Sequence, residues 1–227
     1  MIYTNLHSGR FISRPNRFIA MVEIDGKTEK CHVKNTGRCR ELLVPGAQVF
    51  LEKSDNPARK TQYDLVAVYK GDRLINMDSQ APNKVFHEYL LSGKYMEGIT
   101  LIRPETTHGV SRFDFYVEAG ERKIFIEVKG VTLERDGVIL FPDAPTQRGV
   151  KHLNELAECV SQGYEAHAVF IIQMSDVRYF TPNRETHPAF ADALAAATEA
   201  GVNVTALDCT VSPGVVDINK EVPVVLG

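Results

Sequence analysis

Hydrophobic and polar residues alternate along residues 112–130, RFDFYVEAGERKIFIEVKG. Apolar side chains recur with a period of two on both sides of Gly120 and Glu121: Phe113, Phe115, Val117, Ile124, Ile126 and Val128. This pattern predicts two strands, with these apolar side chains on one face, joined by a two-residue turn that has glycine at its first central position. Such a turn sets an antiparallel register in which Tyr116 faces Phe125.

The polar face of this hairpin places two carboxylates opposite each other. In the same register Asp114 faces Glu127, and Lys129 lies two residues further along that face. Carboxylates ~4 Å apart repel by about 1 kcal/mol in water and by about 4 kcal/mol near a protein surface. A divalent cation bridged by both would offset this repulsion, since Mg²⁺ binds carboxylates together with water and phosphate oxygens. The alternative is a solvated polar face on which Lys129 softens the repulsion.

Short strands separated by turn residues fill the first 80 residues. We expect strands at 17–25, 27–35, 47–54, 63–70 and 73–78. A short helix is expected in 36–43, with Thr36 as its N-cap. Regular short strands with one helix predict a small closed or nearly closed barrel.

The pattern changes near residue 80, which divides the chain into predicted domains at 1–80 and 81–227. Helices are expected at 83–92, from Thr146 to Gly163, and at 187–200. Expected strands occupy 99–103, 112–118, 123–133, 136–143, 165–174, 202–209 and 220–226. The segment 165–174, EAHAVFIIQM, is typical of a strand buried on both faces. The second domain is therefore predicted to be a mixed sheet flanked by helices, and the whole chain an α+β protein.

Composition excludes several classes of protein. The chain has 227 residues, 44% hydrophobic and 24% charged, which is ordinary for a globular protein. No apolar run is long enough for a membrane span and the first residues lack a signal-peptide core, so we expect a cytoplasmic protein with no membrane partner. Four scattered cysteines fit a reducing compartment, and the seven histidines form no zinc-binding pattern. The net charge of −3 combines +4 in residues 1–80 with −7 in 81–227.

An Asp on one strand and Glu-x-Lys on the next, followed by a helix and a strand, is the layout of PD-(D/E)xK phosphodiesterases. We predict Asp114, Glu127 and Lys129 as catalytic residues. Asp114 and Glu127 would hold Mg²⁺ or Mn²⁺, with Glu88 as a further ligand, although an exposed helix glutamate is the simpler interpretation of Glu88. Lys129 would orient the attacking water and neutralise charge.

Polar and basic residues at two places are predicted to contact nucleic acid. Gln147, Arg148, Lys151 and His152 lie opposite the apolar stripe near a helix N-terminus, where phosphate is favoured, and Arg112 lies opposite Lys129 in the predicted register. Lys34, Arg38 and Arg40 surround the first domain's strand-to-helix junction. A merely solvated face is the alternative for the helix residues. A role in holding the loop to the second domain is the alternative for Arg38.

Six strings resemble the sugar fermentation stimulation protein A family: NTGR (35–38), APN (81–83), SRFDF (111–115), IEVKGVTL (126–133), FPDAPTQRGVKHL (141–153) and FTPN (180–183). The similarity is collinear and covers nearly the whole chain. It implies an OB-type β-barrel joined to a PD-(D/E)xK nuclease-like domain, DNA as the partner, and a regulatory link to maltose metabolism.

Two functions remain open from the sequence. The first is a DNA-binding protein without sequence preference that carries a Mg²⁺-dependent nuclease site. The second is a non-catalytic DNA-binding regulatory factor linked to sugar metabolism. An intact Asp…Glu-x-Lys set favours the first, whereas the association of the family with DNA binding rather than with a defined cleavage reaction favours the second. A structural module without a nucleic-acid role is a third possibility, which the resemblance disfavours.

Overall fold

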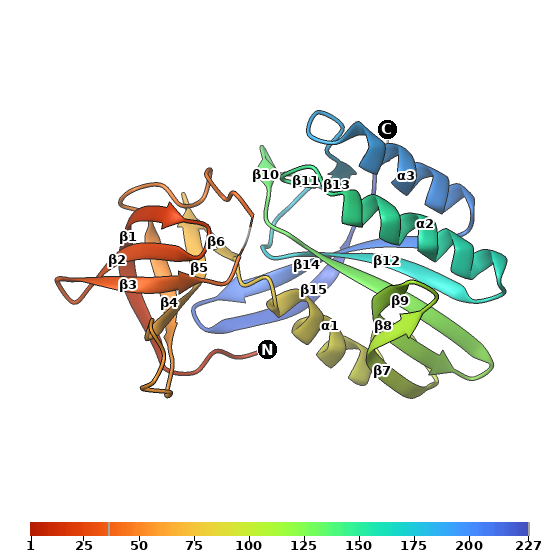
Figure 1. The fold of residues 1–227 in the computed structure, drawn as a ribbon, viewed down its shortest axis with the longest axis horizontal. Helices are drawn as coiled ribbons and strands as arrows, with labels where there is room; N and C mark the ends of the chain where they lie inside the picture. Colours follow the sequence, from red (N-terminus) through yellow and green to blue (C-terminus); the bar gives the residue numbers. More distant parts are fainter. Residues whose placement is uncertain (36, 227) are drawn as a thin grey trace.

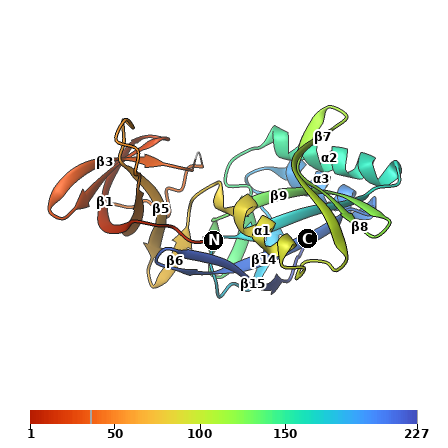
Figure 2. The same ribbon diagram turned by 90° about the horizontal axis from the view of Figure 1, so that it is seen from below.

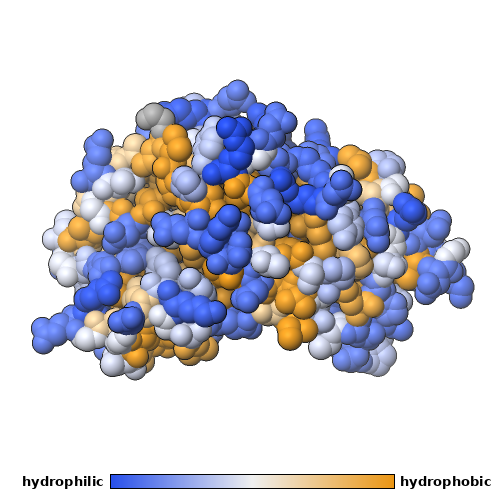
Figure 3. All heavy atoms as spheres, turned by 180° about the vertical axis from the view of Figure 1, so that it is seen from behind, coloured by the Kyte–Doolittle hydropathy of each residue, from blue (hydrophilic) through white to orange (hydrophobic). Residues whose placement is uncertain are grey.

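The structure is a computed structural model that describes residues 1–35 and 37–226. It has a smaller lobe of strands, drawn red to orange, beside a larger lobe of sheet and helices, drawn yellow to blue (Figure 1). On the face seen from behind, apolar residues lie in patches between hydrophilic ones (Figure 3). No helix in the described ranges has both the length and the apolar character needed to cross a bilayer.

The smaller lobe is a closed barrel. Its strands are β1 (Leu6–Asn16), β2 (Ile19–Ile24), β3 (Lys27–Val33), β4 (Gln48–Lys53), β5 (Tyr63–Lys70) and β6 (Arg73–Asn76). They follow the order β3-β2-β1-β4-β5-β6, and a parallel pairing of β3 with β5 closes the barrel. All other neighbours are antiparallel. This arrangement confirms the predicted OB-type barrel.

Two details of the barrel differ from the sequence prediction. Strand β1 was not expected, because along its eleven residues only Phe11 is fully buried and the apolar alternation is weak. No helix forms over residues 37–43, and Thr36, its predicted cap, lies outside the described residues. Cys39 adopts φ 44°, which a right-handed helix does not allow, so the segment makes only a turn in which the Leu43 N–H donates to Cys39 O at 2.9 Å.

The larger lobe is built on a six-stranded mixed sheet, which confirms the predicted α/β architecture of this half. Its elements are α1 (Ala81–Leu91), β7 (Ile99–His108), β8 (Ser111–Ala119), β9 (Arg122–Val131), α2 (Gln147–Ser161), β12 (Glu165–Ile172), α3 (Pro188–Glu199), β14 (Asn203–Ser212) and β15 (Val215–Val222). The strand order is β15-β14-β12-β9-β8-β7, with β9, β12 and β14 parallel. Helix α1 packs on one face, and α2 and α3 pack on the other (Figure 2). A small sheet of β10 (Glu134–Arg135), β11 (Val138–Phe141) and β13 (Tyr179–Pro182) lies beside it.

Between Phe115–Ile126 and the turn, the β8–β9 hairpin has the predicted register, with Tyr116 opposite Phe125 and Gly120 at φ 63°. The predicted pair of Asp114 with Glu127 lies beyond the end of this ladder. The faces of the hairpin differ from two of the sequence interpretations. The alternative of a solvated polar face does not hold at Phe125 and Glu127, which are buried on the side that α2 covers. Phe113 and Phe115 also enter different core clusters: the Phe113 ring lies 5.3 Å from Phe125, whereas Phe115 lies 5.8 Å from Phe86 of α1.

The two lobes are joined by a buried polar network, which we call the junction network: Tyr3, Lys34, Asn76, Asp78 and Gln173. Asp78 is fully buried and accepts from Tyr3 Oη at 3.2 Å and from Lys34 Nζ at 3.4 Å. Asn76 Nδ2 donates to Tyr3 Oη at 2.9 Å, and Gln173 Nε2 donates to Asn76 Oδ1 at 2.7 Å. The network therefore ties the barrel to the loop that follows β12.

Candidate active site and nucleic-acid interface

Asp114 lies where strands β8 and β9 separate. The last pair of their ladder is Phe115 with Ile126. Beyond it, Asp114 Oδ2 accepts the backbone N–H of Val128 at 2.8 Å, and Oδ1 accepts from Asn83 Nδ2 of α1 at 2.7 Å. We call this place, formed by Asp114, Glu127 and Lys129, the fork. The Asp114 carboxylate is thus fixed from both the sheet and α1.

Glu127 is held by a side chain of α2, which packs on the face of the sheet opposite to α1. It is 4% exposed, and its Oε1 contacts both Lys129 Nζ and His152 Nδ1 of α2. Its second oxygen, Oε2, is buried and has no hydrogen-bond partner among the described residues. The fork therefore contains one buried carboxylate oxygen that is free to bind a donor or a cation.

The protein environment shifts the pKa values of the two carboxylates in opposite directions. Burial, followed by the charge of Glu127, raises the pKa of Asp114. Burial also pushes the pKa of Glu127 upward, but hydrogen bonding from His152 and the charge of Lys129 outweigh it, so its pKa lies below the ordinary value. These partners offset much of the repulsion that the hairpin register implies.

Glu88 does not join the fork. Its Oε2 accepts from the Met1 ammonium at 2.6 Å, and its side chain is 57% exposed. Across residues 1–35 and 37–226, no cluster of three or more His, Cys, Asp or Glu side chains is placed to hold an ion. Two residues that the sequence did not assign to this role, Asn83 and His152, support the fork instead. The sequence signal for Asn83 was its place in the first turn of α1.

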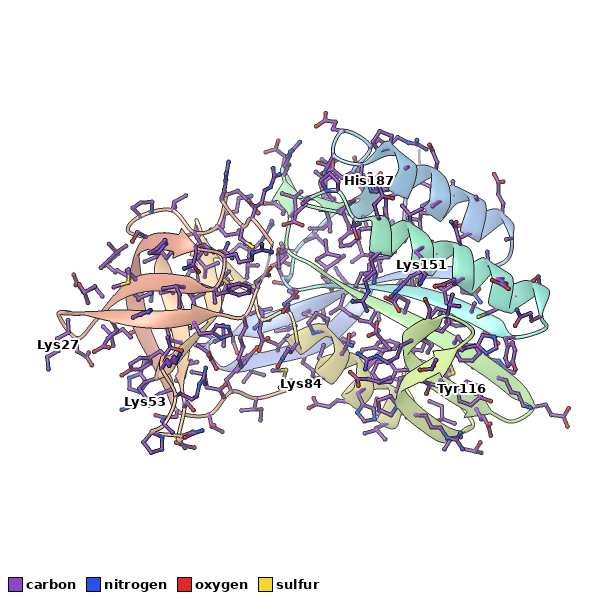
Figure 4. The ribbon with its side chains drawn as sticks, viewed as in Figure 1. Lys27, Lys53, Lys84, Tyr116, Lys151 and His187 are labelled. Atoms are coloured by element: carbon purple, nitrogen blue, oxygen red, sulfur yellow. The ribbon has the colours of Figure 1, made fainter. Side chains whose placement is uncertain are left out.

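Helix α2 presents three of its four predicted polar residues to solvent. Thr146 caps the helix by accepting the Gly149 N–H at 3.0 Å. Gln147, Arg148 and Lys151 are exposed, and Lys151 lies on the helix above the sheet (Figure 4). His152 is buried and turned toward Glu127, so it is not part of the exposed face.

Arg112 is exposed and lies 3.5 Å from Glu105. It pairs with Thr107 of β7, and the β8–β9 ladder ends before it. The predicted pairing of Arg112 with Lys129 is therefore not formed, although Arg112 stays on the strand that leads into the fork.

The three basic residues of the barrel occupy two environments. Lys34 is largely enclosed, with its Nζ 3.4 to 3.7 Å from carboxylates of Asp78, Asp64 and Glu52. Burial opposes its positive charge, but the three carboxylates prevail and raise the pKa of Lys34. Arg38 and Arg40 are exposed, and the Arg38 backbone N–H donates to Asp143 Oδ2 at 3.1 Å. The structure therefore separates Lys34 from the exposed arginines.

The fold and the site define the class of this protein. It is a two-domain protein in which an OB-type barrel is fused to a mixed α/β domain, and the second domain carries paired carboxylates where two strands separate. Two family models match it: "SfsA N-terminal OB domain" over residues 12–77 and "Sugar fermentation stimulation protein RE domain" over residues 80–215. The chain belongs to the sugar fermentation stimulation protein family, as the resemblance predicted.

Known relatives match along nearly their whole length. A sugar fermentation stimulation protein homolog of Clostridium beijerinckii is 58% identical over 226 residues, covering 100% of both chains. A homolog of Desulfitobacterium hafniense is 63% identical, covering 100% of this chain and 99% of its own. The solved structure of Pyrococcus furiosus SfsA in complex with Ca²⁺ is 30% identical, with a TM-score of 0.90, covering 99% of this chain and 97% of that one.

Proposed function

We propose that this protein binds DNA without sequence preference and carries a Mg²⁺- or Mn²⁺-dependent phosphodiesterase site at the fork. The observation that carries the proposal is Glu127 Oε2, a buried carboxylate oxygen with no partner among the described residues. The residue after Glu127, Val128, donates its N–H to Asp114, and Lys129 contacts the other oxygen of Glu127. A buried carboxylate oxygen without a partner is costly, and a bound cation would satisfy it.

The residues at the fork suit a hard divalent cation. Mg²⁺ is commonly held by one or two carboxylates, with waters and substrate phosphates completing its shell, so Asp114 and Glu127 suffice without Glu88. The Pyrococcus furiosus relative was solved with Ca²⁺, which also takes oxygen ligands. When bound, the ion would stabilise charge on the phosphate and lower the pKa of a water.

Each side chain at the fork has a distinct task in this proposal. Asn83 and the Val128 N–H orient the Asp114 carboxylate, and His152 orients Glu127. Lys129 supplies a positive charge beside Glu127, where it neutralises a phosphate oxygen and orients the attacking water. Arg112 is exposed on β8, and Gln147, Arg148 and Lys151 are exposed on α2, and these side chains would contact the DNA backbone.

Metal-dependent melting tests the proposal. With DNA present, Mg²⁺ or Mn²⁺ should raise the melting temperature of the wild type, because the cation binds only the native state. Asp114→Asn should abolish this shift without lowering the stability of the metal-free protein, since its amide oxygen can still accept the Val128 N–H and the Asn83 amide can turn its oxygen toward the new NH2 group. Lys129→Ala should keep the shift but lose cleavage of labelled DNA. Glu121→Gln, an exposed carboxylate of the same hairpin, is the matched control and should behave as wild type.

One observation favours the second candidate, a non-catalytic DNA-binding regulatory factor linked to sugar metabolism. Lys129 already offsets the charge of Glu127, and His152 contacts the same carboxylate oxygen, so these two side chains hold Glu127 without a cation. If the wild type shows neither a metal-dependent shift nor chelator-sensitive cleavage, this second function replaces the first.

For either function we propose a cytoplasmic location, which fits four buried cysteines that form no disulfide.

A further inference from the structure

A surface hollow at one end of the barrel is lined by Arg14, Arg17, Arg38 and Arg40, with Asn16 and Leu43. We call it the arginine hollow. Among the described residues its lining contains these four arginines and no carboxylate, and Asp143 lies at its edge, where it accepts the Arg38 N–H. A surface hollow with this lining attracts an anionic chain, because the cations act together on ligands that approach it.

Arg14 holds together the backbone segments that form the hollow. Its guanidinium donates to four backbone carbonyls at 2.7 to 2.9 Å: Asn35, Gly37, Arg38 and Arg17. It therefore joins the β1–β2 turn to the loop after β3, and it holds the backbones of Arg17 and Arg38 around one planar group. The side chains of Arg17, Arg38 and Arg40 remain exposed.

An exposed aromatic ring lies beside the hollow. Phe18 is 49% exposed, and the Arg17 guanidinium lies 5.5 Å from the centre of its ring. The position of Phe18 is fixed, since its N–H donates to Asn16 Oδ1 at 2.9 Å and its carbonyl accepts the Val33 N–H at 2.8 Å. An aromatic ring next to cations offers a base a surface for stacking and its phosphates a set of counter-charges.

We infer that the arginine hollow and Phe18 form a binding site for single-stranded nucleic acid, in which an unpaired base stacks on Phe18 and adjacent phosphates contact Arg17, Arg38 and Arg40. Base faces are covered in a duplex, so stacking on Phe18 selects unpaired nucleotides. This inference rests on the proposed DNA binding and names its substrate class. The hollow adjoins the second lobe, because the Arg38 N–H donates to Asp143 in the loop that leads to α2.

Binding of a fluorescent oligothymidylate of about 12 nucleotides, followed by anisotropy in chelator, tests the inference. The wild type should bind it more tightly than a duplex of equal length. Phe18→Leu should weaken single-strand binding by roughly 5- to 100-fold and leave duplex binding unchanged, whereas Phe18→Tyr should bind as wild type. Arg17→Gln with Arg38→Gln should weaken binding and reduce the slope of log K against log salt by about 1.4.

Lys27→Gln with Lys30→Gln is the control for charge. Both lysines are exposed on β3, and Lys27 begins this strand at the end of the barrel away from the second lobe (Figure 4). This pair should change affinity less than two-fold. The inference is overturned if Phe18→Leu binds the single strand as tightly as the wild type, or if it weakens duplex binding by the same factor. It is also overturned if the lysine variant loses as much affinity as the arginine variant, or if a polyglutamate peptide competes for the protein as well as DNA does. Chelator keeps this test independent of cation binding at the fork.

Discussion

Glu127 is enclosed between a lysine of its own strand and a histidine of α2, with the Glu127 and His152 side chains 5% and 6% exposed. A carboxylate in this position depends on its partners, because water cannot replace them. His152 was predicted as a nucleic-acid contact from its place near the N-terminus of α2. Its contact with Glu127 gives it instead a structural task at the fork.

Truncation of His152 should therefore destabilise the protein more than truncation of its neighbour. His152→Ala leaves the buried Glu127 carboxylate with one partner fewer and should lower the free energy of unfolding by roughly 2–4 kcal/mol. Lys151→Ala removes an exposed side chain whose ion pair with Glu155 spans 3.6 Å, and it should cost less than about 0.5 kcal/mol. Urea denaturation at neutral pH measures both. Equal losses would show that His152 does not support Glu127.

At the scale of an element, the start of α2 decides where His152 and Lys151 lie. Thr146→Ala removes the side-chain oxygen that accepts the Gly149 N–H and should lower the free energy of unfolding by about 1 kcal/mol. Thr146→Ser keeps that oxygen and should retain most of the stability. Thermal denaturation compares the two variants, and an Ala variant as stable as the Ser variant would contradict the capping role.

The sequence was most informative where local pattern alone determines an element. The hairpin register and α2 followed from alternation, a turn glycine and a capping threonine. Strand β1 was missed because its pairing with the neighbouring strands β2 and β4, and not an alternation of its own, holds it in place. The expected grouping of Asp114, Glu127 and Lys129 came from register, whereas the contributions of Asn83 and His152 depend on helices that pack on opposite faces of the sheet. Pattern within one segment cannot reveal such packing.

At the scale of the whole molecule, the junction network makes the stability of the two lobes interdependent. Asp78→Ala removes the common acceptor of Tyr3 and Lys34, leaves the Lys34 charge with fewer partners, and should cost roughly 3–5 kcal/mol. We expect calorimetry to show one unfolding transition for the wild type and two for this variant. Asp72→Ala, in the exposed β5–β6 turn, is the control and should leave a single transition. A single transition in Asp78→Ala would mean that other contacts couple the lobes.

The pairing of residues near the two ends of the described chain has a consequence for synthesis on the ribosome. The Tyr3 N–H donates to Gly214 O at 2.8 Å, and Ile2 forms a bridge with Val215 at the start of β15. All strand pairs of the barrel lie within residues 6–76, so the barrel is able to close early during translation. At a typical elongation rate, residues 2 and 3 then wait on the order of ten seconds for their partners to emerge. Throughout that interval the backbone groups of residues 2 and 3 remain without the partners that they have in the folded protein.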